Sequence, residues 1–512
     1  MLNSILFYTK VGTKNPMFFI AILFTFLLGI RTISVLEESV FKYTKYFYFG
    51  FIFFNFFLII ISASVIYKKY NVLSFLENSN EKKVVIVFIS NLFITLLASI
   101  PMIIMIFIFK NPLFELNTTL LGAFHFLIIW LTCNALAISI GITSATILKN
   151  EFSIILALII YSLFIYISFG YLPNTSINRY FNIFDDYTYI VSNDIAGIIF
   201  NNQYLIDKFF IIILSIIIVF IGLFIVSLTK KLLFFIFLMV FTSIFFFLLL
   251  DGVHIQDQHT PILLKNSEKN YIIEDYTMDI QLNDILTNRA QINLIPNEDS
   301  KNATFLLDKS FIINSISVNG NKAEYSLKNN YLDIYYDFIE NQKISIQIDY
   351  SGKLSIKNNL GYDLFYVDRN AVNLSGDEFY WYPTPLGNTP INFDVEIKNS
   401  TDIYSNLPNF NDSNKQIFKG SAKYVSLFAG NYQEYTSKSI KYIFPISYNF
   451  KDFKTEIDTL INAILTNPSN NFSDEEINML KNTSYTQVIV GNWEGDNLKL
   501  VNDTLLIKYK NY

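Results

Sequence analysis

The sequence predicts two structural regions: an α-helical polytopic membrane domain of about seven spans, then an all-β sandwich or saddle domain with a small α/β tail. Up to Leu250 the chain is mostly Ile, Leu and Phe, whereas from Asp251 onward Asn, Asp, Lys, Ser and Tyr predominate. In the later half, apolar residues alternate with a period of two, as at Ile344, Ile346 and Ile348. This alternation is typical of half-buried strands.

Seven segments are long and apolar enough to cross a bilayer, which takes about 20 residues. They are residues 17–36, 46–67, 84–109, 118–147, 152–171, 209–228 and 232–250. Lys and Arg collect on the cytoplasmic side, and here they favour an N-terminus inside the cell, with Lys208 in an outer segment. We therefore expect a multi-pass cell-membrane protein whose residues after Leu250 are extracellular.

Few polar side chains interrupt these predicted spans. Apart from Arg31 at the outer end of the first span, His125 is their one charged or titratable group of interest, and Asn55, Asn91 and Asn134 are their amides. These residues make no proton relay, so we expect them to form hydrogen bonds between helices. The single cysteine, Cys133, lies in an apolar run, which excludes an intrachain disulfide and indicates a small core residue.

Two further segments predict helices outside the spans. Residues 1–16 place their apolar residues near one helix face with lysines beside it, which suits a short interfacial helix. The longest inner loop, 68–83, holds an apolar patch between lysine pairs, made of Val72, Leu73, Phe75 and Leu76. An amphipathic helix there would offer an anchor to a cytoplasmic partner. An ordinary surface loop is the alternative interpretation.

This order of parts resembles permease subunits of exporter-type ATP-binding-cassette transporters over about residues 1–230. The stretch NVLSFLENSNEKKVVIVFISNLF falls where those permeases carry their coupling helix, although the Arg-Glu pair and the proline often found there are missing. The resemblance implies that the patch of Val72, Leu73, Phe75 and Leu76 contacts a separate cytosolic ATPase. It leaves a second permease copy open as a partner, besides the lipid bilayer. The chain has no Gly-x4-Gly-Lys-Ser/Thr loop of its own.

The later half has turn signals between its predicted strands, at Asn319–Gly320 and Ser351–Gly352. Four phrases follow in order: FIINSISVNGNKAEYSLKNNYLDIYY, ISIQIDYSGKLS, FYWYPTPLGNTPINFDVEIKNSTDIYSNLP and YVSLFAGNYQEY. They look like the N-terminal β domain of the aminopeptidase N family of zinc metallopeptidases, over about residues 270–440. Residues 251–269 would then be a juxtamembrane linker, and 441–512 an incomplete α/β tail that resembles the opening of the catalytic domain.

The catalytic chemistry of that family is missing from this sequence. Its zinc site takes His-Glu-x-x-His, because two histidines four apart share a helix face. The three histidines here are His125, His254 and His259, and none belongs to such a motif. His254 and His259 would point about 140° apart on a helix, so we interpret HIQDQH as a solvated linker. The sequence predicts no catalytic residue, no cofactor, no metal site and no enzyme activity.

The charge composition of the chain argues against one class of partner, nucleic acids. The net charge is −5 and no basic run occurs in the polar half, which argues against nucleic-acid binding. Abundant Asn, Lys, Ile and Phe suggest an AT-rich bacterial genome. We expect a permease subunit driven by a separate ATPase, with an extracellular, non-catalytic β domain and a substrate that the sequence does not name. The alternative is a membrane-anchored, truncated or inactive aminopeptidase-N-like protein.

Overall fold

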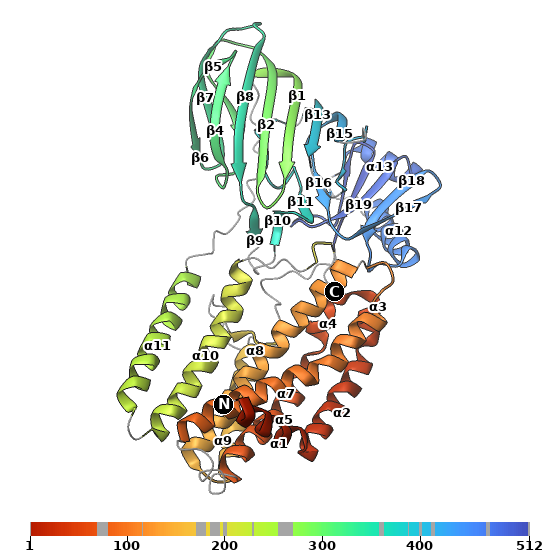
Figure 1. The fold of residues 1–512 in the computed structure, drawn as a ribbon. Coiled ribbons are helices and arrows are strands. Elements are labelled where there is room, and N and C mark those ends of the chain that lie inside the picture. The colour runs from red at the N-terminus through yellow and green to blue at the C-terminus, as the bar shows by residue number, and fades with distance from the viewer. Residues whose placement is uncertain are drawn as a thin grey trace. The chain divides into compact units, whose positions relative to one another are not determined.

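The computed structural model describes residues 2–68, 80–114, 116–169, 181–184, 195–197, 202–227, 230–253, 270–357, 363–387, 389–398, 402–410, 415–466 and 472–509. The chain forms two compact units. The helical unit comprises residues 1–192 and 198–256, and the strand unit comprises residues 193–197 and 257–512. Figure 1 shows helices throughout the first and mainly strands in the second.

The described helices of the helical unit occur at every predicted span. They are α1 (Leu2–Thr13), α2 (Pro16–Arg31), α3 (Ile33–Glu38), α4 (Val40–Tyr46), α5 (Tyr48–Lys68), α7 (Asn80–Phe109), α8 (Leu116–Leu148), α9 (Phe152–Ser168), α10 (Asn202–Val226) and α11 (Lys231–Val253). Five of them, α5, α7, α8, α10 and α11, are long and apolar enough to cross a membrane. A sixth span results if α1 and α2 count as one bent pair, whereas α9 has only 17 residues. The seven predicted spans are therefore reduced to about five.

A short helix forms over the N-terminal residues and meets the next helix at a bend of 67°. Asn15 caps α2, because its side-chain oxygen accepts the Met17 N–H at 3.0 Å, and Pro16 starts the helix. One face of α1 packs on α7, where the Ser90 hydroxyl donates to the Ile5 carbonyl at 3.1 Å. Its other face exposes apolar residues such as Leu2. The location of α1 in a membrane interface stays a prediction.

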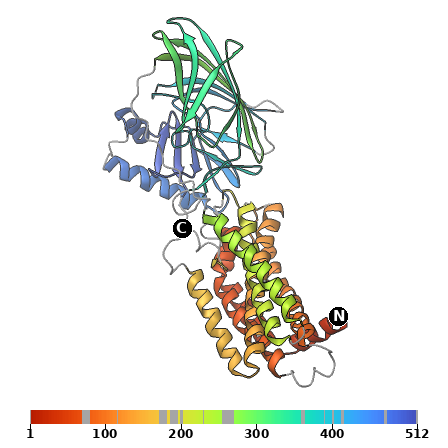
Figure 2. The same cartoon turned by 90° about the vertical axis from the view of Figure 1, so that its left-hand side faces the viewer.

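The long helix α8 forms the centre of the helical unit. It is buried along most of its length, and α5, α7, α9 and α10 all pack against it. Small residues allow these helices to approach closely, as is usual between membrane helices. At Gly141 an added Cβ would lie 3.0 Å from the Ile59 carbonyl oxygen of α5. Figure 2 shows the long helices running alongside one another.

The strand unit contains four sheets in its described part. The seven-stranded sheet has the order β15 (Gln416–Ala422), β13 (Ile391–Lys398), β1 (Tyr271–Leu282), β2 (Leu286–Pro296), β8 (Ile344–Gly352), β4 (Ile312–Val318), β5 (Asn321–Lys322). The four-stranded sheet has the order β12 (Thr384–Pro385), β3 (Ser300–Leu306), β7 (Tyr331–Phe338), β6 (Glu324–Lys328). The predicted β-rich region is confirmed.

Two five-stranded sheets complete the strand unit. One has the order β14 (Tyr404–Ser405), β16 (Leu427–Ala429), β11 (Ala371–Leu374), β10 (Asp363–Asp368), β9 (Ser355–Lys357). The other is β17 (Tyr432–Ser437), β18 (Ile440–Pro445), β19 (Gln487–Gly491), β21 (Thr504–Lys508), β20 (Leu498–Val501). Strands β18, β19 and β21 are parallel neighbours, and α12 (Phe450–Thr466) and α13 (Asp474–Asn482) lie in the connection between β18 and β19. The last part of the chain is therefore an α/β layer.

Aromatic residues of the stretch FYWYPTP lie in the core of the strand unit. Trp381 and Tyr382 are fully buried, and the Trp381 indole N–H donates to the Val425 carbonyl at 3.1 Å. Neighbouring phenols bond to the backbone of this stretch: Tyr276 donates to Pro383 at 2.8 Å and Tyr350 to Trp381 at 2.9 Å. The Tyr382 hydroxyl accepts the Val425 N–H at 3.2 Å. Burial raises the pKa of Tyr276, Tyr350 and Tyr382, so all three phenols remain neutral.

Candidate functional site

The predicted partner-contact residues Val72, Leu73, Phe75 and Leu76 lie outside the described residues. The structure does describe the helix that follows them. Glu81, in the first turn of α7, accepts a hydrogen bond from the Ser227 hydroxyl at 2.7 Å and lies 3.6 Å from the Lys230 ammonium. The start of α7 and the connection between α10 and α11 therefore meet at the same end of the helical unit.

Two of the three intramembrane asparagines form the predicted hydrogen bonds between helices. The Asn55 amide of α5 donates to the Tyr161 hydroxyl of α9 at 2.5 Å, and the Asn91 amide of α7 donates to Ser62 of α5 at 3.0 Å. Asn134 differs from them. Its side chain is buried in α8 and makes no hydrogen bond with any residue in the described part of the chain.

The expectation that His125 is the one ionisable group in the spans besides Arg31 stays a prediction, but the helical unit buries further ionisable residues near the start of α10. Helix α10 starts before its apolar run, and its candidate span begins at Tyr204, so Asp207 and Lys208 lie inside it and are 6% and 4% exposed. The Lys208 ammonium is 5.5 Å from the centre of the Tyr204 ring, and the His125 ring is 5.9 Å from it. Buried ionisable residues in a helix that could span a membrane are candidate functional residues.

The sequence spacing in α10 could have indicated the polar cluster of Tyr204, Asp207, Lys208 and His125. Tyr204, Asp207, Lys208 and Ile211 follow the i, i+3, i+4, i+7 spacing of one helix face, and all four are buried. The stripe continues the buried face of α10 beyond its apolar residues. Sequence reasoning missed it because hydropathy alone ends the predicted span at the first charged residues.

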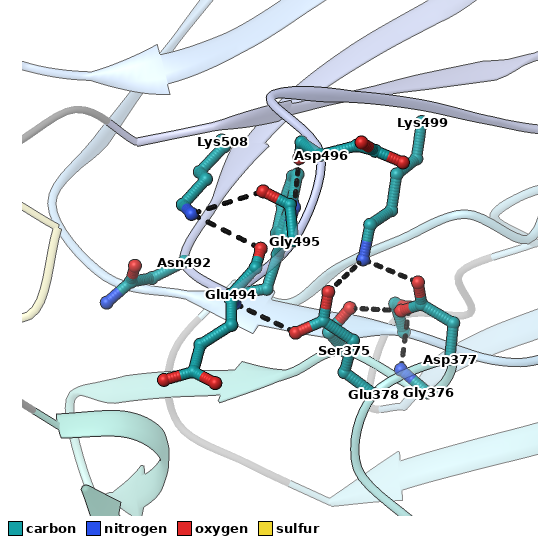
Figure 3. A network of polar contacts seen from close by, with 12 residues as sticks. Ser375, Gly376, Asp377, Glu378, Asn492, Glu494, Gly495, Asp496, Lys499 and Lys508 are labelled. Carbon is teal, nitrogen blue, oxygen red and sulfur yellow. Dashed lines mark hydrogen bonds and ion pairs between the residues drawn. The ribbon is translucent and has the colours of Figure 1, made fainter. Parts of the chain in front are cut away.

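A second polar cluster lies in the strand unit (Figure 3). The Lys499 ammonium, from β20, is 2.5 Å from an Asp377 carboxylate oxygen and 2.6 Å from a Glu378 carboxylate oxygen. All three side chains are only 13–20% exposed. The Lys499 ammonium also lies 4.9 Å from the centre of the Trp493 ring. One partly buried cation therefore neutralises part of the charge of two adjacent carboxylates.

Further hydrogen bonds hold these carboxylates in place. Ser375, directly after β11, donates its hydroxyl to Asp377 at 2.6 Å, and the Glu494 N–H donates to Glu378 at 2.8 Å. Gly495 has φ 53°, and a Cβ there would lie 3.0 Å from the Glu378 carboxylate. The Lys508 ammonium bonds to the carbonyls of Glu494 and Gly495 at 3.2 and 3.4 Å. The network ties the loop after β11 to the last sheet of the chain.

This network connects two parts of the strand unit, the loop after β11 and the strand β20. Its lysine is already bound to both carboxylates, and the segments it connects are more than 100 residues apart in the sequence. Within the described ranges, no group of three or more His, Cys, Asp or Glu side chains could hold a metal ion. The predicted linker residues His254, Asp257 and His259 lie outside those ranges.

Comparison with known proteins finds similarity to solved structures alone. No family model matches the chain, and no curated protein matches it. The C-terminal half is similar to an M1 zinc metallopeptidase from Deinococcus radiodurans, at 11% identity and a TM-score of 0.35, covering 48% of this chain and 62% of that one. It is also similar to aminopeptidase A of Legionella pneumophila, at 16% identity and a TM-score of 0.34, covering 47% and 31%.

A third similar structure is yeast LTA4 hydrolase in complex with bestatin, at 8% identity and a TM-score of 0.33, covering 49% of this chain and 43% of that one. In each case the chain spans less than two thirds of the structure that it resembles.

Proposed function

We propose that this chain is the membrane-spanning permease subunit of an ATP-binding-cassette transporter, driven by a separate cytosolic ATPase. The observation that supports it best is the contact of Glu81 with Ser227 and Lys230. This contact joins the first turn of α7, which follows the predicted inner loop in the sequence, to residues between α10 and α11 at one end of the helical unit. That end carries Lys82, Lys83, Lys230 and Lys231, and such lysines collect on the cytoplasmic side, where the ATPase would bind.

The proposed topology follows from that end of the helical unit. Helix α11 starts there at Lys231 and has 23 residues, which span about 35 Å, enough to cross the hydrocarbon core. The residues after Val253 would then emerge outside the cell. The strand unit would be an extracellular module, and its ligand and the transported substrate are open.

Impermeant thiol labelling of intact cells tests this topology. In a Cys133→Ser background, Ser310→Cys in the strand unit should be labelled, because Ser310 is exposed. Ser79→Cys, in the predicted inner loop, should be labelled only after the membrane is permeabilised. The reverse pattern would invert the topology and remove the ATPase proposal with it.

Coupling to the ATPase is tested at the apolar patch of the inner loop. Buried anchors of a helix in a groove typically contribute about 2 kcal/mol each, so Leu76→Asp should weaken ATPase binding roughly thirtyfold. The measurement is the amount of ATPase that co-purifies with the chain. Leu113→Asp is the matched control, since Leu113 is exposed and lies between α7 and α8, at the other end of α7. Unchanged co-purification in the Leu76 variant, or no ATPase with the wild-type chain, would contradict the proposal.

We also propose that this chain has no peptidase activity of its own, because its sequence contains no His-Glu-x-x-His motif. The second candidate function, a membrane-anchored aminopeptidase-N-like protein, is favoured by the phrases that resemble that family, of which Trp381 and Tyr382 are core residues. Zinc content and hydrolysis of aminoacyl substrates by the purified chain separate the two. Chelator-sensitive aminopeptidase activity, in a preparation free of other peptidases, would favour the second candidate.

A further inference from the structure

A short segment between two helices of the helical unit belongs to the strand unit. Residues 195–197 lie in the sequence between α9 and α10, yet residues 193–197 are part of the same compact unit as residues 257–512. Ile195 is 1% exposed and joins a hydrophobic cluster to which β18, β19 and α12 contribute residues such as Ile440, Val488 and Phe453. An apolar side chain is thus inserted into a core formed by a distant part of the chain.

The backbone of Ile195 also contacts this part of the strand unit, through hydrogen bonds. Its carbonyl oxygen accepts the Asn431 backbone N–H at 2.8 Å and the Asn431 side-chain amide at 3.3 Å. Gly430 has φ 153°, and a Cβ at this position would lie 2.3 Å from the same carbonyl oxygen. Glycine is therefore the residue that allows the segment to approach this corner, which lies between β16 and β17.

We infer that the corner formed by Gly430 and Asn431 is a docking site for residues 195–197, which lie between α9 and α10 in the sequence. The strand unit is then made of residues from two parts of the chain, one before α10 and one after α11. Both the segment and its docking site must lie on one side of the membrane. Helices α10 and α11 therefore form a hairpin that enters and leaves the bilayer on that side. This inference uses neither the lysine distribution nor the ATPase, so it goes beyond the proposed function.

Cysteine protection measures the docking directly in the full chain. In a Cys133→Ser background, Ile195→Cys should react with an impermeant maleimide far more slowly than the exposed reference Ser310→Cys. Adding Gly430→Ala should raise the labelling rate of the Ile195→Cys thiol roughly tenfold or more, because the new methyl group displaces the Ile195 carbonyl and raises the undocked population. Gly320→Ala is the matched control, since Gly320 also has positive φ, +81°, but an added Cβ meets nothing within 4 Å.

Labelling of the Ile195→Cys thiol at the rate of the exposed reference, or equal rates in the Gly430 and Gly320 variants, would overturn the inference. A cross-link gives a second measurement that does not depend on Gly430. Ile195→Cys with Asn431→Cys, in the same background, should form a disulfide on mild oxidation. After cleavage at a protease site inserted between residues 254 and 269, the two fragments should stay joined until reduced. Fragments that separate without reduction would equally overturn it.

Discussion

The helical unit and the strand unit place their apolar side chains in opposite ways. Helix α11 leaves Leu232 73% and Phe247 69% exposed, whereas Trp381 and Tyr382 in the strand unit are fully buried. Buried polar side chains occur in both units, such as Asn134 in the helical unit and Asn373 in the strand unit. Water drives apolar side chains inward, but lipid offers no such drive, and helices in lipid associate through close packing and hydrogen bonds.

The largest expected effect on stability comes from introducing an aspartate on an exposed surface of each unit. Ile100 in the middle part of α7 and Ile339 in the strand unit are 48% and 54% exposed. Ile100→Asp should cost about 3 kcal/mol, because lipid would surround this exposed side chain of a helix that is long and apolar enough to span a membrane. Ile339→Asp should change stability by less than about 0.5 kcal/mol, because it faces water. The amount of membrane-inserted protein and its thermal unfolding midpoint measure both. Similar losses in the two variants would break the comparison.

Within the strand unit, the same substitution should distinguish a partly buried ion pair from a more exposed one. Lys499→Met leaves Asp377 and Glu378, which are 20% and 16% exposed, without their cation and should reduce the free energy of unfolding by about 2 kcal/mol. Lys398→Met is the control, because its pair with Asp279 is 44% exposed on both sides and should contribute below about 1 kcal/mol. Thermal unfolding followed by the β-sheet circular dichroism signal compares them. Equal shifts would mean that the Lys499 network does not connect its segments.

Inside the helical unit, replacing Asn55 and Asn134 with leucine should change the stability by different amounts. Asn55→Leu removes the hydrogen bond to Tyr161 and should cost about 1 kcal/mol. Asn134→Leu should cost nothing, because the Asn134 amide makes no hydrogen bond in the described part of the chain. Thermal unfolding in detergent measures both. A loss at Asn134 as large as that at Asn55 would show that the Asn134 amide has a bound partner.

The smallest effect concerns acid stability on the surface of the strand unit. Burial alone would raise the pKa of Asp349, but hydrogen bonds from Arg289, Gln347 and Ser315 outweigh it and lower that pKa below 3.8. The unfolded chain therefore takes up the proton first as pH falls, so this stabilisation is complete near neutral pH and is lost in acid.

Asp349→Asn should consequently reduce the free energy of unfolding by less than about 1 kcal/mol at about pH 7. The difference from the wild type should shrink towards about pH 3, below the ordinary pKa of an aspartate. Unfolding midpoints at the two pH values measure it. A difference that grows in acid would contradict the sign of the pKa shift.

Local patterns were sufficient to predict many elements of both units. Alternation predicted β8, whose residues Ile344, Ile346 and Ile348 are all buried, because a strand sends successive side chains to opposite faces. Runs of Ile, Leu and Phe likewise predicted where the long helices occur. The helices do not coincide with the predicted spans at their ends: α9 runs over Phe152–Ser168, and α10 begins at Asn202, before the predicted span that starts at residue 209.

The candidate sites were less predictable, because they depend on contacts between distant parts of the chain. Nothing near Lys499 in the sequence indicates Asp377 and Glu378 as its partners, since the two segments meet only when β20 and the loop after β11 are assembled. The buried positions of Asp207 and Lys208 depend on α8 packing against α10.

The sequence by itself determined the two classes of structure, because hydrophobic periodicity and composition act within a few residues of each position. It also contains no His-Glu-x-x-His motif. Only the tertiary structure decided that Ile195 belongs with the strands and that Gly430 must lack a side chain. Both facts depend on the contact between the Ile195 carbonyl oxygen and the backbone at Gly430. These residues are 235 positions apart in the sequence (430 − 195), so local patterns do not encode their contact.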